Sequence, residues 1–308
     1  MALDPQAALF LQMAADAPPL DTITPDAARQ AVVETIPVTG EPATLASVED
    51  TAITTATGTV PVRVYRPSLA PGLPVSTYFH GGGWVIGDLD THDRITRDLA
   101  AASGAVVVAV DYRRAPESPF PAAYDDCLGV VQRLLEDGAG LGVDPARVAV
   151  AGDSAGGNLA AVACQRLRGV GSGIAHQVLI FPVTDAAAVG ATASYREFGE
   201  GHFLTTRDMA YFVRSYAGRT DPADPRISPI RAADLSGLPP ATVLTAECDP
   251  LRDEGEAYAR DLERAGVEVT LRRFDGQVHP FVLIGSVIDD ALVARSWLGE
   301  RLRAAFTP

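Results

Sequence analysis

The stretch Val148-Ala-Val-Ala-Gly-Asp-Ser-Ala-Gly-Gly-Asn-Leu-Ala160 joins a strand pattern to a helix pattern through a glycine-rich turn. Gly-x-Ser-x-Gly alone is a weak signal, but between a strand and a helix it is typical of a nucleophile elbow. Ser154 would lie at the helix N-terminus, where free amides and the helix dipole favour developing negative charge. We therefore predict Ser154 as a nucleophile. The alternative is a turn that only starts a helix.

Strand and helix patterns alternate on both sides of this stretch. Alternation of this kind predicts an α/β fold, with a mostly parallel central sheet and helices on both faces. A two-residue period at 59–65, with Pro61, indicates an outer strand. The remaining strands are expected at 75–79, 105–110, 147–151, 177–181, 241–246 and 267–274, and the helices at 93–103, 123–136, 155–168, 254–265 and 287–305.

The alternation breaks once, between Pro182 and Pro239, where an aromatic-rich segment shows helical spacing at 195–198 and 206–216. Residues 4–16 also read as an amphipathic helix, followed by a proline-rich connection. A helix this short does not persist alone in water, so we expect it to dock on the aromatic segment as a helical cap. The predicted units are an N-terminal cap segment 1–52, core 53–182, cap insertion 183–238 and core 239–308. The alternatives are a helical excursion packed on the core and a frayed N-terminus.

Composition excludes several classes of function. The chain has 39 acidic and 25 basic residues and a net charge of −14, which argues against nucleic acid and anionic membrane surfaces as partners. All bases are arginine, and the absence of lysine excludes Schiff-base chemistry, a P-loop lysine and Ser-x-x-Lys hydrolases.

The cysteines and the apolar segments say little about function. The 3 cysteines have no metal-ligand spacing, so no metal is expected. The N-terminal residues lack the pattern of a signal peptide, and the strongest apolar run, 105–110, is too short to span a bilayer. We therefore expect a cytoplasmic protein without integral membrane association.

A second glycine-rich loop, His80-Gly-Gly-Gly-Trp84, follows the strand pattern 75–79. Successive glycines expose backbone amides that can bind an oxyanion, and this motif is a known oxyanion loop of lipases and esterases. A phosphate-binding loop is the rival, but no Lys, Ser or Thr follows. Trp84 either lines an acyl pocket or packs under the loop.

A serine nucleophile needs a base, and the chain has 5 histidines. His279 follows the last strand pattern, at the sheet edge that also carries Ser154, so we predict it as the base. His80 is expected to brace the glycine loop, and His92 to begin a helix on its polar side. His176 begins a strand and His202 lies in the predicted cap.

The acidic partner of the base should precede it in the chain and stand at the end of the penultimate strand. Asp249 stands where the pattern 241–246 ends, before a proline, and the order Ser154, Asp249, His279 matches that of α/β-hydrolases. Glu247 and Asp253 compete for this role, although we expect Asp253 to cap the next helix.

The sequence as a whole resembles the bacterial hormone-sensitive-lipase-like esterases, or family IV, of the α/β-hydrolase fold. From about residue 55 to the end, four motifs carry the resemblance: His80-Gly-Gly-Gly-Trp84, Asp111-Tyr-Arg-Arg-Ala-Pro-Glu117, Gly152-Asp-Ser-Ala-Gly156 and Asp249-Pro-Leu-Arg-Asp253. The resemblance implies a serine carboxylesterase that acts on short- to medium-chain esters without a cofactor. It implies the triad Ser154, Asp249 and His279, and an oxyanion hole formed by the amides of Gly81, Gly82 and Ala155. It also implies a homodimer as one expected state, often formed through the last strand, 267–274.

One departure from the family and two alternatives stand beside this hypothesis. Family members commonly have His-Gly-Phe at the base, whereas this chain has His279-Pro280-Phe281, which removes a backbone donor beside the base. An amidase or peptidase on the same fold would use the same triad. A hydrolase-like binding protein is the other alternative, although all three predicted triad residues are present.

Overall fold

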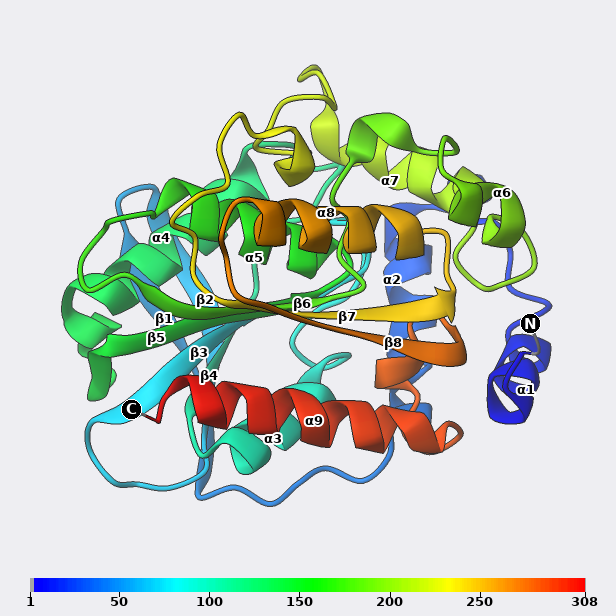
Figure 1. Ribbon diagram of the computed structural model, residues 1–308. Helices are drawn as coiled ribbons and strands as arrows, with labels where there is room; N and C mark the ends of the chain where they lie inside the picture. Colours follow the sequence, from blue (N-terminus) through cyan, green and yellow to red (C-terminus); the bar gives the residue numbers. More distant parts are fainter. Residues whose placement is uncertain (1–2, 308) are drawn as a thin grey trace.

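The computed structural model describes residues 3–307 and places one sheet through the centre of the molecule (Figure 1). The sheet has 8 strands in the order β1-β2-β4-β3-β5-β6-β7-β8. β2 pairs antiparallel with β1 and β4, whereas all the other pairs are parallel, which confirms the predicted mostly parallel sheet. The strands are β1 (Ser47–Thr55), β2 (Gly58–Arg66), β3 (Leu73–Phe79), β4 (Val106–Val110), β5 (Val143–Asp153), β6 (Ile174–Ile180), β7 (Ala241–Cys248) and β8 (Val269–Val278).

The edge of the sheet differs from the sequence prediction. The expected outer strand 59–65 is β2, but β1 lies outside it and forms the edge. Most of β1 is exposed, and Ile53 and Thr55 are its only buried residues. A strand that buries so little shows no clear alternation of apolar and polar residues, and its pattern is therefore missed.

Helices cover both faces of the sheet, as predicted (Figure 1). One face carries α3 (Asp93–Ser103) and α9 (Asp289–Ala305), and the other carries α4 (Ala122–Asp137), α5 (Ala155–Arg166) and α8 (Arg252–Arg264). Every residue of β4 is buried, as expected for a central strand packed on both faces. Within residues 3–307, no helix is long and apolar enough to cross a membrane.

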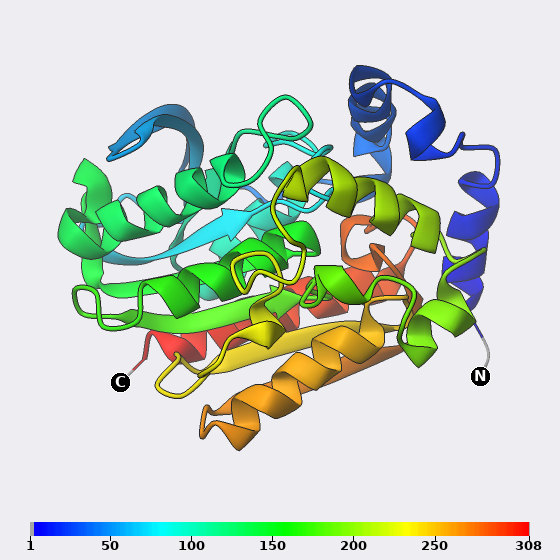
Figure 2. The ribbon, with the colours of Figure 1, turned by 90° about the horizontal axis from the view of Figure 1, so that it is seen from above.

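Four further helices come from the two predicted cap segments. The N-terminal segment contributes α1 (Pro5–Met13) and α2 (Pro25–Val33), and the insertion contributes α6 (Ala193–Phe198) and α7 (Thr206–Ala217). Figure 2 shows the two segments side by side. The rings of Phe10 and Phe203 lie 5.1 Å apart, and Arg207 Nε donates to Asp21 Oδ2 at 2.9 Å. The expected contact between the N-terminal helix and the insertion is therefore present.

Candidate active site

Ser154 lies between β5 and α5 in a strained backbone conformation. Its φ of 55° and ψ of −117° are unusual for a residue with a side chain, and such conformations cost about 1–3 kcal/mol. The surrounding backbone holds it there, because Ser154 N donates to Ile180 O at 2.8 Å and Ser154 O accepts from Val183 N at 3.2 Å. The turn has the shape of a nucleophile elbow.

Glycines at the elbow allow the loop after β3 to approach closely. A Cβ atom on Gly156 would clash with the carbonyl oxygens of Phe79 and His80. A Cβ atom on Gly152 would clash with the carbonyl of Gly156 in the same turn. Any larger residue at either position would push the turn and the 80–87 loop apart.

His279 and Asp249 meet at the ends of β8 and β7. His279 Nδ1 lies 2.8 Å from Asp249 Oδ2, and both residues are buried. The other carboxylate oxygen, Asp249 Oδ1, accepts from Leu251 N at 2.9 Å. The ring of Phe181, which follows β6, lies 4.5 Å from the His279 ring and packs against it. The three predicted triad residues thus follow β5, β7 and β8 at one edge of the sheet.

The two competing acids have other partners. Glu247 Oε2 accepts a hydrogen bond from Gly276 N at 2.6 Å. Asp253 accepts from Ser194 N at 2.8 Å and pairs with Arg252 at 2.9 Å. The expected helix cap is therefore wrong for Asp253, which instead ties α6 of the insertion to α8.

The remaining histidines have structural partners. His80 Nδ1 lies 2.8 Å from Gly81 O, and its ring stacks on Tyr112 at 4.1 Å, so His80 braces the glycine loop as expected. Burial lowers the pKa of His80 to about 3, which keeps this side chain neutral.

His176 is buried in β6, with Nε2 2.8 Å from Thr242 Oγ1. His202 Nδ1, in the insertion, lies 2.9 Å from Glu200 O.

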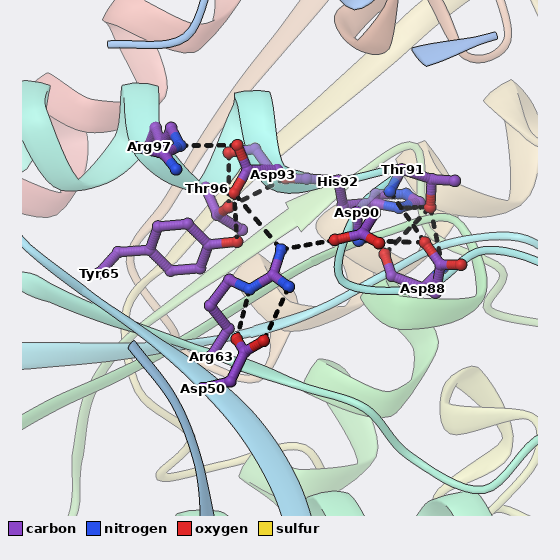
Figure 3. Close-up of polar contacts among 10 residues, drawn as sticks. All are labelled: Asp50, Arg63, Tyr65, Asp88, Asp90, Thr91, His92, Asp93, Thr96 and Arg97. Carbon is purple, nitrogen blue, oxygen red and sulfur yellow. Dashed lines mark hydrogen bonds and ion pairs between the residues drawn. The ribbon is translucent and has the colours of Figure 1, made fainter. Parts of the chain in front are cut away.

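His92 differs from its predicted position on the polar side of a helix. The side chain is buried, and its Nε2 lies 3.4 Å from Asp153 Oδ2. The first turn of α3 lies against the elbow, so this residue faces inward despite its polar neighbours. Figure 3 shows those neighbours, including Thr91 Oγ1 at 3.0 Å from His92 Nδ1 and the ion pairs that Arg63 makes with Asp50 and Asp90.

The loop that contains the three glycines turns its carbonyl groups into the protein. Gly82 O accepts from Val85 N and Ile86 N, Trp84 O accepts from Ala115 N, and Gly87 O accepts from Arg114.

Within residues 3–307, the amides of Gly82, Gly83 and Ala155 donate to no protein acceptor. These backbone donors of the loop and the elbow therefore remain available.

The Gly81 amide does not match the predicted oxyanion hole. Gly81 N donates to Asp153 Oδ1 at 3.0 Å and lies 3.3 Å from His92 Nε2. This amide already has an acceptor inside the protein, whereas the amides of Gly82, Gly83 and Ala155 have none among the described residues.

Trp84 packs under the loop rather than lining a pocket. Its side chain is 0% exposed, and its ring stacks on Tyr216 of α7 at 4.3 Å with an interplanar angle of 6°. The structure thus supports the packing alternative and not the acyl-pocket role.

Asp153, the residue before Ser154, has a role that the sequence analysis missed. Its buried carboxylate also accepts from Tyr78 OH at 2.7 Å. Burial by itself would raise the pKa of Asp153, but His92 and Tyr78 outweigh burial and hold it below its usual value. An acidic residue inside Gly-x-Ser-x-Gly, in a chain that also has a glycine-rich loop, is the sequence signal that could have identified this role.

Comparison with known proteins identifies the family. Residues 76–283 match a family described as having the alpha/beta hydrolase fold. The chain belongs to this family. The match confirms the predicted fold and the predicted family resemblance.

Relatives of this α/β-hydrolase include enzymes named for ester hydrolysis. An ethyl acetate hydrolase of Pseudomonas putida is 40% identical over 305 residues, which covers 94% of this chain and 95% of the relative. A carboxylesterase of Mycobacterium tuberculosis is 44% identical over 241 residues, which covers 76% of this chain and 75% of the relative.

Solved structures of esterases have the same architecture. A thermostable esterase from Pseudomonas putida ECU1011 superposes with a TM-score of 0.94 at 39% identity, covering 100% of this chain and 98% of that one. A hyperthermophilic esterase from Pyrobaculum calidifontis superposes with a TM-score of 0.92 at 40% identity, covering 99% of each chain.

Proposed function

We propose that this α/β-hydrolase is a serine carboxylesterase that cleaves acyl esters through an acyl-serine intermediate. The observation that carries the proposal is the meeting of three features at one sheet edge. These are the strained Ser154 at the N-terminus of α5, the 2.8 Å contact between His279 and Asp249, and the free amides beside them. The relatives named as esterases support the same activity.

The contacts of His279 support a direction for the proposed proton transfer. Since Nδ1 faces Asp249 Oδ2, Nε2 is the nitrogen left to take the proton from Ser154 Oγ as the oxygen attacks the ester carbonyl. His279 then donates this proton to the leaving alcohol, and water releases the acyl group. Asp249 holds the imidazole tautomer and stabilises the imidazolium.

The amides of Gly82, Gly83 and Ala155 form the proposed oxyanion hole. The carbonyl groups of Gly82, Trp84 and Gly87 already accept internal hydrogen bonds, whereas these three amides remain free to donate to the substrate. Loss of one such donor typically lowers the rate about 10²–10³-fold.

The insertion supports a preference for short- to medium-chain acyl groups. A Cβ atom on Gly83 would clash with the ring of Phe212, so α7 lies directly on the oxyanion loop. A wall this close to the reacting carbonyl limits the room for a long chain.

We also propose that two copies of the chain associate through β8. This strand is last in the sheet order, and Leu271 on it is 39% exposed. Light scattering after size-exclusion chromatography tests the proposal, with L271D expected to shift a dimer to monomer. A monomeric wild type contradicts it.

Turnover of p-nitrophenyl butyrate by S154A tests the enzymatic proposal. We expect the variant to be folded and inactive, because it lacks the attacking oxygen. S76A, which alters a buried serine within β3, is the matched control and keeps its activity. More than a few per cent residual activity in pure S154A would refute the nucleophile assignment. Matched ester and amide substrates separate an esterase from an amidase, and wild-type protein that turns over neither would favour the binding-protein alternative.

A further inference from the structure

Arg29 reaches from the N-terminal segment into the backbone of the oxyanion loop. It lies on α2, and its Nε donates to Val85 O at 2.9 Å. Its Nη2 donates to Ala115 O at 3.0 Å. The two carbonyl groups belong to segments that also bond to each other, because Ala115 N donates to Trp84 O at 2.9 Å. Arg29 thus clamps the loop onto the segment that follows β4.

Every N–H group of the Arg29 guanidinium has an acceptor. Besides the two carbonyl groups, Glu117 receives a bidentate pair at 2.7 and 3.0 Å, and Asp26 accepts at 3.0 Å. The hydrogen bonds that Arg29 donates to Glu117 raise the pKa of Arg29, and the side chain is only 19% exposed. A five-donor fork of this geometry cannot be reproduced by lysine, whose ammonium is a single point.

The clamp acts on the turn that presents the oxyanion amides. Val85 N and Ile86 N both donate to Gly82 O, at 3.0 and 2.9 Å, so Val85 closes the turn that contains Gly82 and Gly83. Fixing Val85 O from outside therefore limits how far these two amides can rotate. Displacements on the order of 1 Å at such a site reduce rates about 10²-fold.

We infer that Arg29 is a positioning residue for the oxyanion hole, through which the N-terminal segment sets the rate of acyl transfer besides covering the site. The inference rests on the proposed esterase activity. The other contacts of this segment that hold the cap together, Phe10 with Phe203 and Asp21 with Arg207, go to the insertion and not to the loop. Positioning and covering can therefore be separated by mutation.

The test compares R29A and R29K with R207A, a control that removes an arginine contact of the same segment without touching the loop. Steady-state kinetics use p-nitrophenyl butyrate, and a stoichiometric organophosphate counts reactive serines in each preparation. We expect kcat per reactive serine to fall about 10-fold or more in R29A, below the full loss of one oxyanion donor. KM should stay within about threefold, R29K should fall between R29A and the wild type, and R207A should keep kcat within about twofold.

A thionoester substrate provides a readout that a purely structural role would not change. Sulfur accepts hydrogen bonds weakly, so a displaced oxyanion hole lowers oxoester turnover more than thionoester turnover. We expect the oxoester-to-thionoester ratio to fall in R29A and to recover partly when methylguanidinium is added.

The outcomes separate this inference from the proposed function. Wild-type protein without turnover or a titratable serine would refute the esterase activity itself. An active wild type with unchanged kcat per serine in R29A would overturn the positioning role. If R29A does not fold, R29K decides, and wild-type kcat together with a wild-type thionoester ratio in that variant overturns the inference.

Discussion

The carboxylate of Asp153 accepts a hydrogen bond from the backbone amide of Gly81 at 3.0 Å, so the residue before the proposed nucleophile holds the first glycine of the oxyanion loop. Tyr78 OH donates to the same oxygen from β3, at 2.7 Å. Elbow and loop are therefore joined by a buried polar contact as well as by the close approach at Gly156. This contact directs the Gly81 amide inward, whereas the next two amides have no protein acceptor among the described residues.

Replacing Asp153 by alanine should lower both stability and kcat. D153A leaves the Tyr78 hydroxyl unsatisfied in the interior, which typically costs about 1–3 kcal/mol, and leaves the Gly81 amide only its longer contact to His92 Nε2 at 3.3 Å. D153N keeps one acceptor oxygen and should lose less. Urea unfolding and kcat per titrated serine measure the two effects. Wild-type kcat in D153A would show that this contact does not orient the loop.

The two histidines near the loop should respond differently to mutation. H279A should be as inactive as S154A, because no other described side chain contacts Asp249 as a base. H80A should remain partly active but be less stable, because it removes the ring that stacks on Tyr112. Kinetics and thermal melts of both variants measure this. An active H279A beside an inactive H80A would reverse the assignment.

Glu254, buried on α8, should make stability depend on pH. Its Oε1 accepts from Thr184 N at 2.7 Å, while its buried Oε2 has no partner among the described residues. Burial raises the pKa of Glu254 to about 8, from an ordinary value of 4.5. Between these two values the native state keeps a proton that the unfolded state releases. The contribution of this group is therefore full below pH 4.5 and is lost as the pH rises toward 8.

E254Q keeps the acceptor oxygen and cannot ionise, so it should remove this dependence. We expect its free energy of unfolding, relative to the wild type, to increase from pH 5 to pH 8.5 by roughly 2–4 kcal/mol. His80 and His176 titrate in the opposite sense, because their lowered pKa values destabilise the fold in acid, but both proteins share them. Urea titrations across this range measure the difference. A difference that stays constant with pH would contradict a protonated Glu254.

Loosening the contact between the two cap segments should change acyl-chain preference. F10A removes a ring packed 5.1 Å from Phe203, where the N-terminal helix meets the insertion. We expect relative turnover of p-nitrophenyl octanoate over acetate to rise, with little change in serine labelling by a small organophosphate. L9A, on the same helix but 50% exposed, is the control. An unchanged profile from acetate to octanoate would show that this contact does not limit chain length.

Local patterns in the sequence were enough to predict the fold and most of the candidate site. The strand–turn–helix around Ser154 depends on neighbouring residues, and so does the glycine run after His80. Asp249 and His279 were predicted from their positions after successive strands, since parallel strands end at the same edge of a sheet. These inferences needed the order of elements along the chain but no contact between them.

Only the tertiary structure decided which groups in the site are free. The Gly81 amide meets an acceptor 72 residues away, and Arg29 meets the Val85 carbonyl 56 residues away. Neither contact produces a periodic pattern in the sequence, because a hydrogen bond between distant segments depends on how whole helices and strands pack. For the same reason, the sequence did not predict that Trp84 is buried against α7 or that His92 is buried against Asp153. The proposed nucleophile was therefore predictable from its own turn, whereas the proposed oxyanion donors depend on which amides are already bonded to other parts of the chain.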